Sequence, residues 1–210
     1  MGRNLRRPYE LPDNLFLMMF SFSISKADKT KSRKYEESLA NIQKFFGGKT
    51  DAKRLERAKA QEAESSMESN LEKSMEAGGI SSLVQMQSDA RMVKLVLTEG
   101  VLFASGSADL KEPARKVLAP ITAELKKIPN RIIIEGHTDN VPIRHGKYSS
   151  NWELSMARAY SVLLFMSGAG ISAKQLAGMG YGENLPIGDN AKAGGRAKNR
   201  RIEISLVKTD

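Results

Sequence analysis

The chain has 210 residues, 40% of them hydrophobic, and a formal net charge of +9 from 33 basic and 24 acidic residues. This length fits one domain with a long extension, or two small domains. Cysteine is absent, which excludes a disulfide framework, a thiol nucleophile and a cysteine-bound zinc, and the aromatic content of 6% favours an acidic polymer or an anionic surface over nucleic acid as the partner.

Residues 1–25 combine a polar, arginine-rich start with a short apolar run, Leu15–Ile24. A membrane-spanning helix needs about 20 apolar residues, and this run is roughly half as long. Arginines before an apolar run fit the cytoplasmic flank of a membrane segment, and no small-residue cleavage site of a signal peptide follows. We therefore expect residues 1–25 to be a shortened membrane anchor.

Residues 26–90 have the composition of a linker that is largely helical or flexible. Between 35 and 46, apolar residues recur at helical spacing: Tyr35, Leu39, Ile42 and Phe46. Residues 49–80 are rich in Ala, Glu, Lys and Ser, with a thin apolar stripe: Leu55, Met67, Leu71 and Met75. Such a segment is a solvated helix, a weak dimer seam or partly disordered.

Residues 91–210 have the composition of a compact α+β domain. The patterns predict, in chain order, a strand at 92–97, a helix marked by Asp109 and Glu112, a strand at 132–135, a helix at 151–167, a short helix at 172–176, a polar loop at 184–198 and a strand at 201–207. This order predicts two strand–helix–strand units, with helices packed on one face of a mixed β-sheet.

A pair of charged residues near the centre of this domain suggests a binding site. Asp139 follows a predicted strand, and Ser150, three residues before Glu153, marks the start of the next helix as a capping box. On that helix Asn151, Leu154 and Arg158 share one face. A carboxylate and a guanidinium around one cleft suit a ligand with both an ammonium and a carboxylate group. The alternative is that Asp139 only caps a turn and Arg158 is a solvated helix charge.

The sequence offers little support for an enzyme or a metal centre. His137, Asp139 and His145 lie within nine residues, but their spacing matches no common metal site. The chain contains no H-E-x-x-H helix, no G-x-S-x-G elbow and no phosphate-binding loop of the G-x-x-x-x-G-K-[ST] type. We expect a protein without catalytic activity, bound metal or cofactor.

Four sequence blocks carry a resemblance to a known family. GHTDN, LSMARA, GMGYGENLP and NRRIEISL occur in this order between residues 92 and 207. They resemble the OmpA-like peptidoglycan-binding domain, most closely the version found in flagellar motor stator B subunits (the MotB/PomB family). The resemblance implies that Asp139 and Arg158 hold the diaminopimelate of the peptidoglycan stem peptide, and that Thr138, Asn151 and Leu154 line the same pocket. It also implies that the Arg200–Arg201 pair is mainly structural. From the residues alone, the basic run Arg196, Lys198, Arg200 and Arg201 either touches carboxylates of the glycan or stem peptide or is a solvated charge run at a strand start.

The resemblance also implies a role for the whole chain. Stator B subunits anchor the ion-driven motor to the cell wall by non-covalent peptidoglycan binding, with a stator A subunit and a second B subunit as partners. They span the inner membrane once and place this domain in the periplasm. Phe20–Ser23 resembles the end of the family's membrane helix. Residues 35–46 hold the position of its channel plug, and the alternative is a short surface helix that acts as a spacer. Asp13 is either the family's ion-binding residue or a loop aspartate. The alternative function is a cell-wall tether unrelated to the motor.

Overall fold

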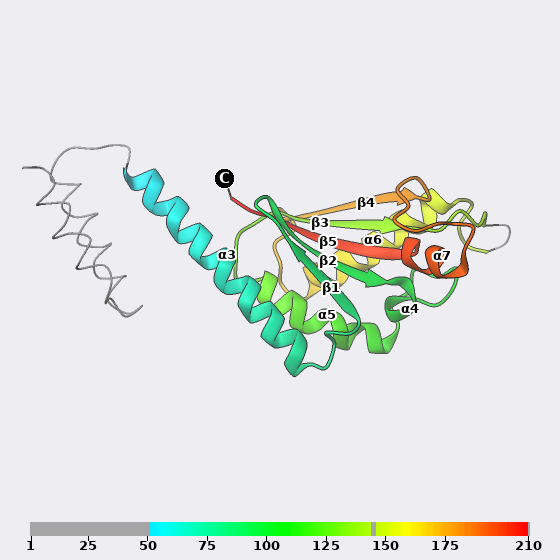
Figure 1. Cartoon of the computed structure of the whole chain (residues 1–210), viewed down its shortest axis with the longest axis horizontal. Coiled ribbons are helices and arrows are strands. Elements are labelled where there is room, and N and C mark those ends of the chain that lie inside the picture. The colour runs from blue at the N-terminus through cyan, green and yellow to red at the C-terminus, as the bar shows by residue number, and fades with distance from the viewer. Residues whose placement is uncertain (1–50, 144–145, 210) are drawn as a thin grey trace, which may run out of the picture. The chain divides into compact units, whose positions relative to one another are not determined.

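The computed structural model describes residues 51–143 and 146–209. The predicted anchor at 1–25, the segment at 35–46 and His145 lie outside these residues. Residues Arg57–Asp210 form one compact unit. The elements are α3 (Asp51–Ala77), β1 (Val84–Ser88), β2 (Met92–Thr98), α4 (Glu99–Leu102), α5 (Glu112–Leu125), β3 (Ile132–His137), α6 (Asn151–Gly168), β4 (Leu176–Gly182), α7 (Ala193–Asn199) and β5 (Arg201–Val207) (Figure 1).

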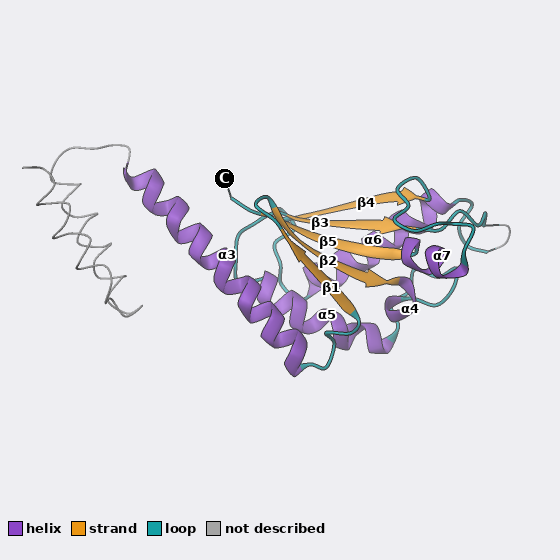
Figure 2. Ribbon diagram, in the orientation of Figure 1, coloured by secondary structure: helices purple, strands orange, loops and turns teal. Residues whose placement is uncertain are grey.

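The five strands form one mixed sheet in the order β1-β2-β5-β3-β4 (Figure 2). Only β3 and β4 pair in parallel, and α6 is the crossover between them, as a parallel pair requires. The central strand β5 runs antiparallel to both β2 and β3, with Ile204 opposite Leu95 and Ile134. The predicted α+β class, with helices against a mixed sheet, is confirmed.

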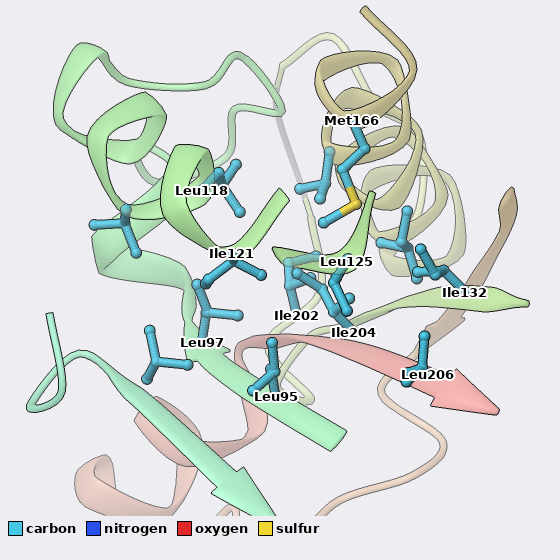
Figure 3. Close-up of a cluster of buried hydrophobic side chains, with 14 of the residues drawn as sticks. Leu95, Leu97, Leu118, Ile121, Leu125, Ile132, Met166, Ile202, Ile204 and Leu206 are labelled. Atoms are coloured by element: carbon cyan, nitrogen blue, oxygen red, sulfur yellow. The ribbon is translucent and has the colours of Figure 1, made fainter. Parts of the chain in front are cut away.

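The hydrophobic core lies between the sheet and the helices α5 and α6. Alternate residues of the central strands point toward the helices, because successive side chains of a strand face opposite sides. The core side chains that Figure 3 labels are Leu95, Leu97, Leu118, Ile121, Leu125, Ile132, Met166, Ile202, Ile204 and Leu206. All ten are buried, so this layer fixes where α6 lies above the sheet.

Two glycines let α6 approach the sheet closely. A Cβ added at Gly136 in β3 would lie 2.1 Å from the carbonyl oxygen of Ser155, and one at Gly180 in β4 would lie 2.4 Å from the amide nitrogen of Met156. Any side chain at these positions would push the helix away. The loop that follows β3 is therefore held next to the N-terminal half of α6.

The compact unit begins before residue 91, where the composition change suggested its start. In α3, Met67, Leu71 and Met75 are buried in the core rather than solvated. The carboxylate of Glu64 accepts hydrogen bonds from the backbone and hydroxyl of Thr209, at 2.8 and 2.9 Å. The C-terminal part of α3 is thus a packed element of the domain, because its apolar side chains lie against the hydrophobic core.

The structure corrects several expected elements. The strands β1 and β4 were not predicted, and residues 172–175 form a turn where a short helix was expected. The predicted polar loop at 184–198 contains most of α7. The helix α5 is capped by Lys111 and not by Asp109. β4 was missed because its three glycines are typical of turns, and its parallel pairing with β3 is a tertiary effect.

Candidate functional site

The N-terminal end of α6 is built as the sequence predicts. The hydroxyl of Ser150 accepts a hydrogen bond from the amide of Glu153 at 3.1 Å, which confirms Ser150 as the cap. The Glu153 carboxylate accepts in return from the amide of Ser149 at 2.7 Å, one residue earlier than in a standard capping box. These two hydrogen bonds fix the residue at which α6 begins, and with it the direction of the side chains on its first two turns.

A cleft of about 520 Å³ opens between the loop after β3, the start of α6 and α4. It is lined by all five residues that the sequence singled out: Thr138, Asp139, Asn151, Leu154 and Arg158. Glu99, Phe103, Arg196 and Arg200 line it as well. The structure therefore brings the predicted carboxylate and guanidinium to one cavity, together with two arginines of the basic run and with Glu99, which the prediction did not include.

Four charged side chains of alternating sign are joined along the wall of the cleft. Arg158 donates through Nη2 to Oε1 of Glu99. Arg200 contacts Oε2 of the same Glu99 through Nε at 2.7 Å, and Oδ2 of Asp139 through Nη1 at 2.6 Å. Asp139 and Arg158 are thus linked through Glu99 and Arg200, and each carboxylate is already neutralised by a guanidinium.

The loop that carries Asp139 is held by its neighbours. The second oxygen of Asp139, Oδ1, accepts from the amide of Val141 at 3.1 Å, so this residue also caps a turn, as the alternative interpretation held. The amide group of Asn151 donates to the carbonyl of Val141 at 3.1 Å and to the carboxylate of Glu183 at 2.6 Å. Asn151 therefore connects the start of α6 to this loop and to the end of β4.

Arg158 is a buried charge, with 2% of its surface exposed, and not a solvated one. Burial lowers the pKa of its guanidinium, and the nearby Glu99 carboxylate opposes that shift. Its Nε donates to the carbonyl of Ser107 at 2.9 Å, and its guanidinium carbon lies 5.4 Å from the ring centre of Phe103. The guanidinium is held in one orientation by contacts on three sides.

Arg200 is bound differently, because its side chain is 37% exposed. The hydrogen bond to Asp139 is the main cause that raises the pKa of Arg200, with Glu99 adding to it and partial burial opposing it. Arg200 can exchange partners at lower cost than Arg158, since solvent replaces part of what it loses. Of the four residues in the charge network, Arg200 is therefore the one that most easily changes its hydrogen-bond partner.

Sequence reasoning missed Glu99 as a residue of the site, and it considered Arg200 only as part of a basic run that could touch ligand carboxylates. The amide of Glu99 donates to the carbonyl of Arg200 at 2.9 Å, because β2 and β5 pair antiparallel and both residues stand at the same end of the pair. The sequence shows only that each is a charged residue next to the end of a predicted strand, at 92–97 and at 201–207. Their partnership depends on which strands pair, and the sequence does not show this directly.

His137, one of the three residues considered as metal ligands, does not line the cleft. His137 precedes Thr138 but its ring stacks on Tyr181 at 5.3 Å, on the face of the sheet opposite to α6. Among residues 51–143 and 146–209, no group of three His, Cys, Asp or Glu side chains is placed to hold a metal ion.

The fold and the four sequence blocks define the class of protein. The sequence profile of the OmpA family matches residues 102–200, the segment that contains α5, α6, β3, β4, α7 and most of the cleft. A solved structure titled as the cell wall anchor of the T6SS from Pseudomonas aeruginosa is 30% identical and aligns over 66% of this chain and 97% of its own, with a TM-score of 0.62. The chain belongs to the OmpA family.

Motility proteins are among the most similar members of that family. Motility protein B of Bacillus subtilis is 31% identical over 157 residues, which cover 72% of this chain. A putative MotB-like protein from Desulfovibrio vulgaris is 29% identical, with a TM-score of 0.67 over 73% of this chain and 99% of its own. The chain spans only about half of the length of the curated relatives that it matches, for example 59% of motility protein B of Bacillus subtilis. The domain is an OmpA-like domain of the MotB type.

Proposed function

We propose that this domain binds peptidoglycan without covalent chemistry, through the cleft at the start of α6. The observation that carries the proposal is the buried pair of Arg158 and Asp139 in one cleft, joined through Glu99 and Arg200. A stem-peptide diaminopimelate has an ammonium and a carboxylate on the same carbon. The cleft presents a carboxylate for the first group and guanidinium groups for the second.

Arg158 keeps one donor for a ligand. Its Nε and Nη2 are used by Ser107 and Glu99, whereas the described residues supply no partner for Nη1. We infer that Nη1 of Arg158 donates to the ligand carboxylate, with its direction already set by the other two bonds.

Asp139 is occupied by Arg200 in the absence of ligand, so binding is an exchange. The ligand ammonium replaces Arg200 at Oδ2 of Asp139, and Arg200, still held by Glu99 at 2.7 Å, turns toward the ligand carboxylate. Each charge then keeps an opposite partner in the complex. This exchange favours a zwitterionic group over a simple cation, because a cation alone would leave Arg200 without a second carboxylate.

The remaining predicted residues shape the cleft. Thr138 and Asn151 both donate to the carbonyl of Asp139, at 2.9 and 3.3 Å, and so hold its backbone in place. Leu154 is buried and offers an apolar wall, suited to the aliphatic chain of diaminopimelate. We assign binding roles to all five residues and no catalytic role to any of them.

For the whole chain we propose the role of a stator B subunit, which anchors the flagellar motor to the cell wall. The similarity to motility protein B of Bacillus subtilis supports it. The proposal implies an inner-membrane location with this domain in the periplasm, a stator A subunit as partner, and a homodimer. Within the described residues, no helix is both long enough and apolar enough to cross a membrane.

A second role is favoured by a specific observation. The similarity to the cell wall anchor of the T6SS from Pseudomonas aeruginosa supports a wall tether that serves a machine other than the flagellar motor. The two roles share the peptidoglycan site and differ in the membrane partner. Co-purification with a stator A subunit, or restored swimming of a strain that lacks its own B subunit, supports the stator; binding to the wall without either result supports the tether.

Co-sedimentation with purified peptidoglycan tests the site. We expect the full chain to pellet, and Asp139→Ala or Arg158→Ala to bind roughly 30- to 1,000-fold more weakly, equivalent to roughly 2–4 kcal/mol for a charge that loses its partner. Lys192→Ala is the control, because Lys192 is exposed and pairs only with Asp189, at 3.8 Å. Folded Asp139 and Arg158 variants that pellet like the wild type would overturn the proposal.

A further inference from the structure

The cleft contains one arginine that the charge network does not include. Arg196 of α7 lines the cleft and is half-buried. Its Nη1 donates to the carbonyls of Asn190 and Ala191, at 2.9 and 3.3 Å. In the described part of the chain its Nε and Nη2 have no acceptor and no carboxylate pairs with it, whereas the other two arginines of the cleft are both paired with Glu99.

The loop before α7 holds this arginine at the wall of the cleft. The side chain of Asn199 is buried, accepts a hydrogen bond from the amide of Gly188 at 2.7 Å and donates to its carbonyl at 2.9 Å. A Cβ added at Gly195 would lie 2.0 Å from the carbonyl oxygen of Asp189, so the loop packs directly against the first turn of α7. The carbonyls that bind Nη1 are therefore fixed in place, and they fix the guanidinium of Arg196.

The charges that line the cleft do not balance. Two of the lining residues are carboxylates, and three are arginines: Glu99 and Asp139, and Arg158, Arg196 and Arg200. Three positive charges against two negative ones leave the wall with a net charge of +1. The zwitterionic group of the proposed ligand is neutral, so it does not compensate this charge. A ligand with one further negative group complements the cleft better.

We propose that Arg196 is a subsite for a second carboxylate of the bound stem peptide. The inference rests on the proposed function, since it takes the zwitterionic group to be bound between Asp139 and Arg158. The Nε and Nη2 atoms lie on one edge of a guanidinium, and such an edge binds a carboxylate through two parallel hydrogen bonds. In Arg196 the bonds of Nη1 set the position of the group, and this edge remains for the ligand.

The stem peptide offers a second carboxylate from two sources. Its glutamate is joined to diaminopimelate through the side-chain carboxyl, which leaves the α-carboxylate free, and the peptide ends in a carboxylate of its own. Amidation of either group removes its negative charge. The cleft, at about 520 Å³, lies within the range of about 300–1,000 Å³ that is typical of sites for ligands larger than one amino acid. The inference therefore predicts that the domain distinguishes free from amidated stem peptides.

Titration of the full chain with soluble tetrapeptides, followed by NMR chemical shifts, tests this preference. The three probes are alanyl-γ-glutamyl-diaminopimelyl-alanine with both carboxylates free, with the glutamate amidated, and with the C-terminus amidated. We expect amidation of one of the two groups to weaken binding at least about fivefold, and that group is the one that Arg196 binds. Equal binding of all three probes would overturn the inference and leave the proposed function in place. A folded chain that binds none of them would contradict both.

The variant Arg196→Gln assigns the preference to this arginine. In this variant the free peptide should bind as weakly as the amidated one. Binding of the amidated peptide should stay within about twofold of the wild type, because the zwitterionic group keeps its partners. Circular dichroism verifies that the variant is folded.

Lys198→Gln is the matched control for the loss of charge. It removes one positive charge from the same helix, at an exposed residue that does not line the cleft, so the preference for the free peptide should be retained. A preference that survives in Arg196→Gln, or one that Lys198→Gln also abolishes, would show a general effect of charge and refute the subsite.

Discussion

Arg200 and Arg201 are neighbours in the sequence, yet they belong to two different charge clusters. Arg200 faces the cleft, where its partly exposed side chain joins Glu99 to Asp139. Arg201 lies on the opposite side of the chain, 3% exposed, and donates to Glu203 at 2.6 Å. Successive side chains of a strand point to opposite faces of the sheet, so the two guanidinium groups at the start of β5 lie on opposite sides.

The two clusters differ in the capacity that they leave for a ligand. One cluster, which we call the closed cluster, is centred on Glu203, whose carboxylate is bound by Lys94 at 2.5 Å and by Arg201. Burial alone would raise the pKa of Glu203, but these hydrogen bonds outweigh it, so the pKa is lowered. The other cluster, which we call the open cluster, consists of Glu99, Asp139, Arg158 and Arg200. There the described residues give no partner to Nη1 of Arg158, and Arg200 can change partner. The same residue types therefore form a structural cluster at one place and the proposed binding site at the other. The family expectation that this arginine pair is mainly structural thus fits the geometry of Arg201 and not that of Arg200.

The largest expected effect is on the open cluster. Arg158→Ala should lower the free energy of unfolding by about 3 kcal/mol or more, because a buried carboxylate loses one of its two cations. Urea denaturation followed by circular dichroism measures it. The control is Arg115→Ala, which removes a largely exposed pair with Glu112 at 3.6 Å and should cost less than about 1 kcal/mol. Equal losses in the two variants would show that burial of the pair does not matter.

The closed cluster should make stability depend on pH. The pKa of His137 is lowered to about 4, mainly by burial, with Arg201 and Lys94 adding and Glu203 opposing. The unfolded chain, with a histidine pKa near about 6.5, binds the proton more readily, so stability is complete above that pH and falls as the pH approaches 4.

The full loss over this window is up to about 3 kcal/mol, from about 2.5 pKa units at 1.36 kcal/mol each. Urea midpoints at pH 7, 5.5 and 4 measure it. In His137→Gln the slope between pH 7 and 5 should largely vanish, since no other group with a lowered pKa in this cluster titrates there. A slope identical to that of the wild type would assign the pH dependence to other groups.

A third change separates stability from binding. Arg201→Met should lower the free energy of unfolding by roughly 1–3 kcal/mol, because Glu203 loses a buried partner but keeps Lys94. Peptidoglycan binding should stay within about twofold of the wild type, because Arg201 does not line the cleft. Co-sedimentation of the folded variant decides this. A large loss of binding would mean that the two clusters are coupled through β5.

The smallest expected effect comes from Arg200. Arg200 is 37% exposed, so in Arg200→Gln water and the glutamine amide replace much of what Asp139 and Glu99 lose, whereas no water replaces buried Arg158. The variant should lose no more than about 1 kcal/mol and unfold near the wild-type midpoint. Binding should change by less than about fivefold, because the freed Asp139 receives the ligand ammonium more readily while one contact to the ligand carboxylate is lost. Co-sedimentation at two salt concentrations measures both contributions. A loss as large as that of Arg158→Ala would refute the exchange of partners at Asp139.

Local patterns in the sequence determined much of the domain. The apolar spacing predicted β2, β3, β5, α5 and α6, and Ser150 marked the first residue of α6 to within one position. The four ordered blocks pointed to the OmpA family, and the five residues that the sequence singled out line one cleft. These features depend on residues close in the chain, where hydrophobic period and capping chemistry act directly.

Only the tertiary structure decided how the charges are shared. Glu99 and Arg200 meet because β2 and β5 pair at the same end, and the preference for that pairing is spread over both strands. The thin stripe of α3 became core because a neighbouring surface was available, and β4 formed a strand because β3 offered a parallel partner. The sequence by itself singled out two charges that line one cleft. The fold determined which other charges hold them, because long-range contacts leave no periodic signal in the chain.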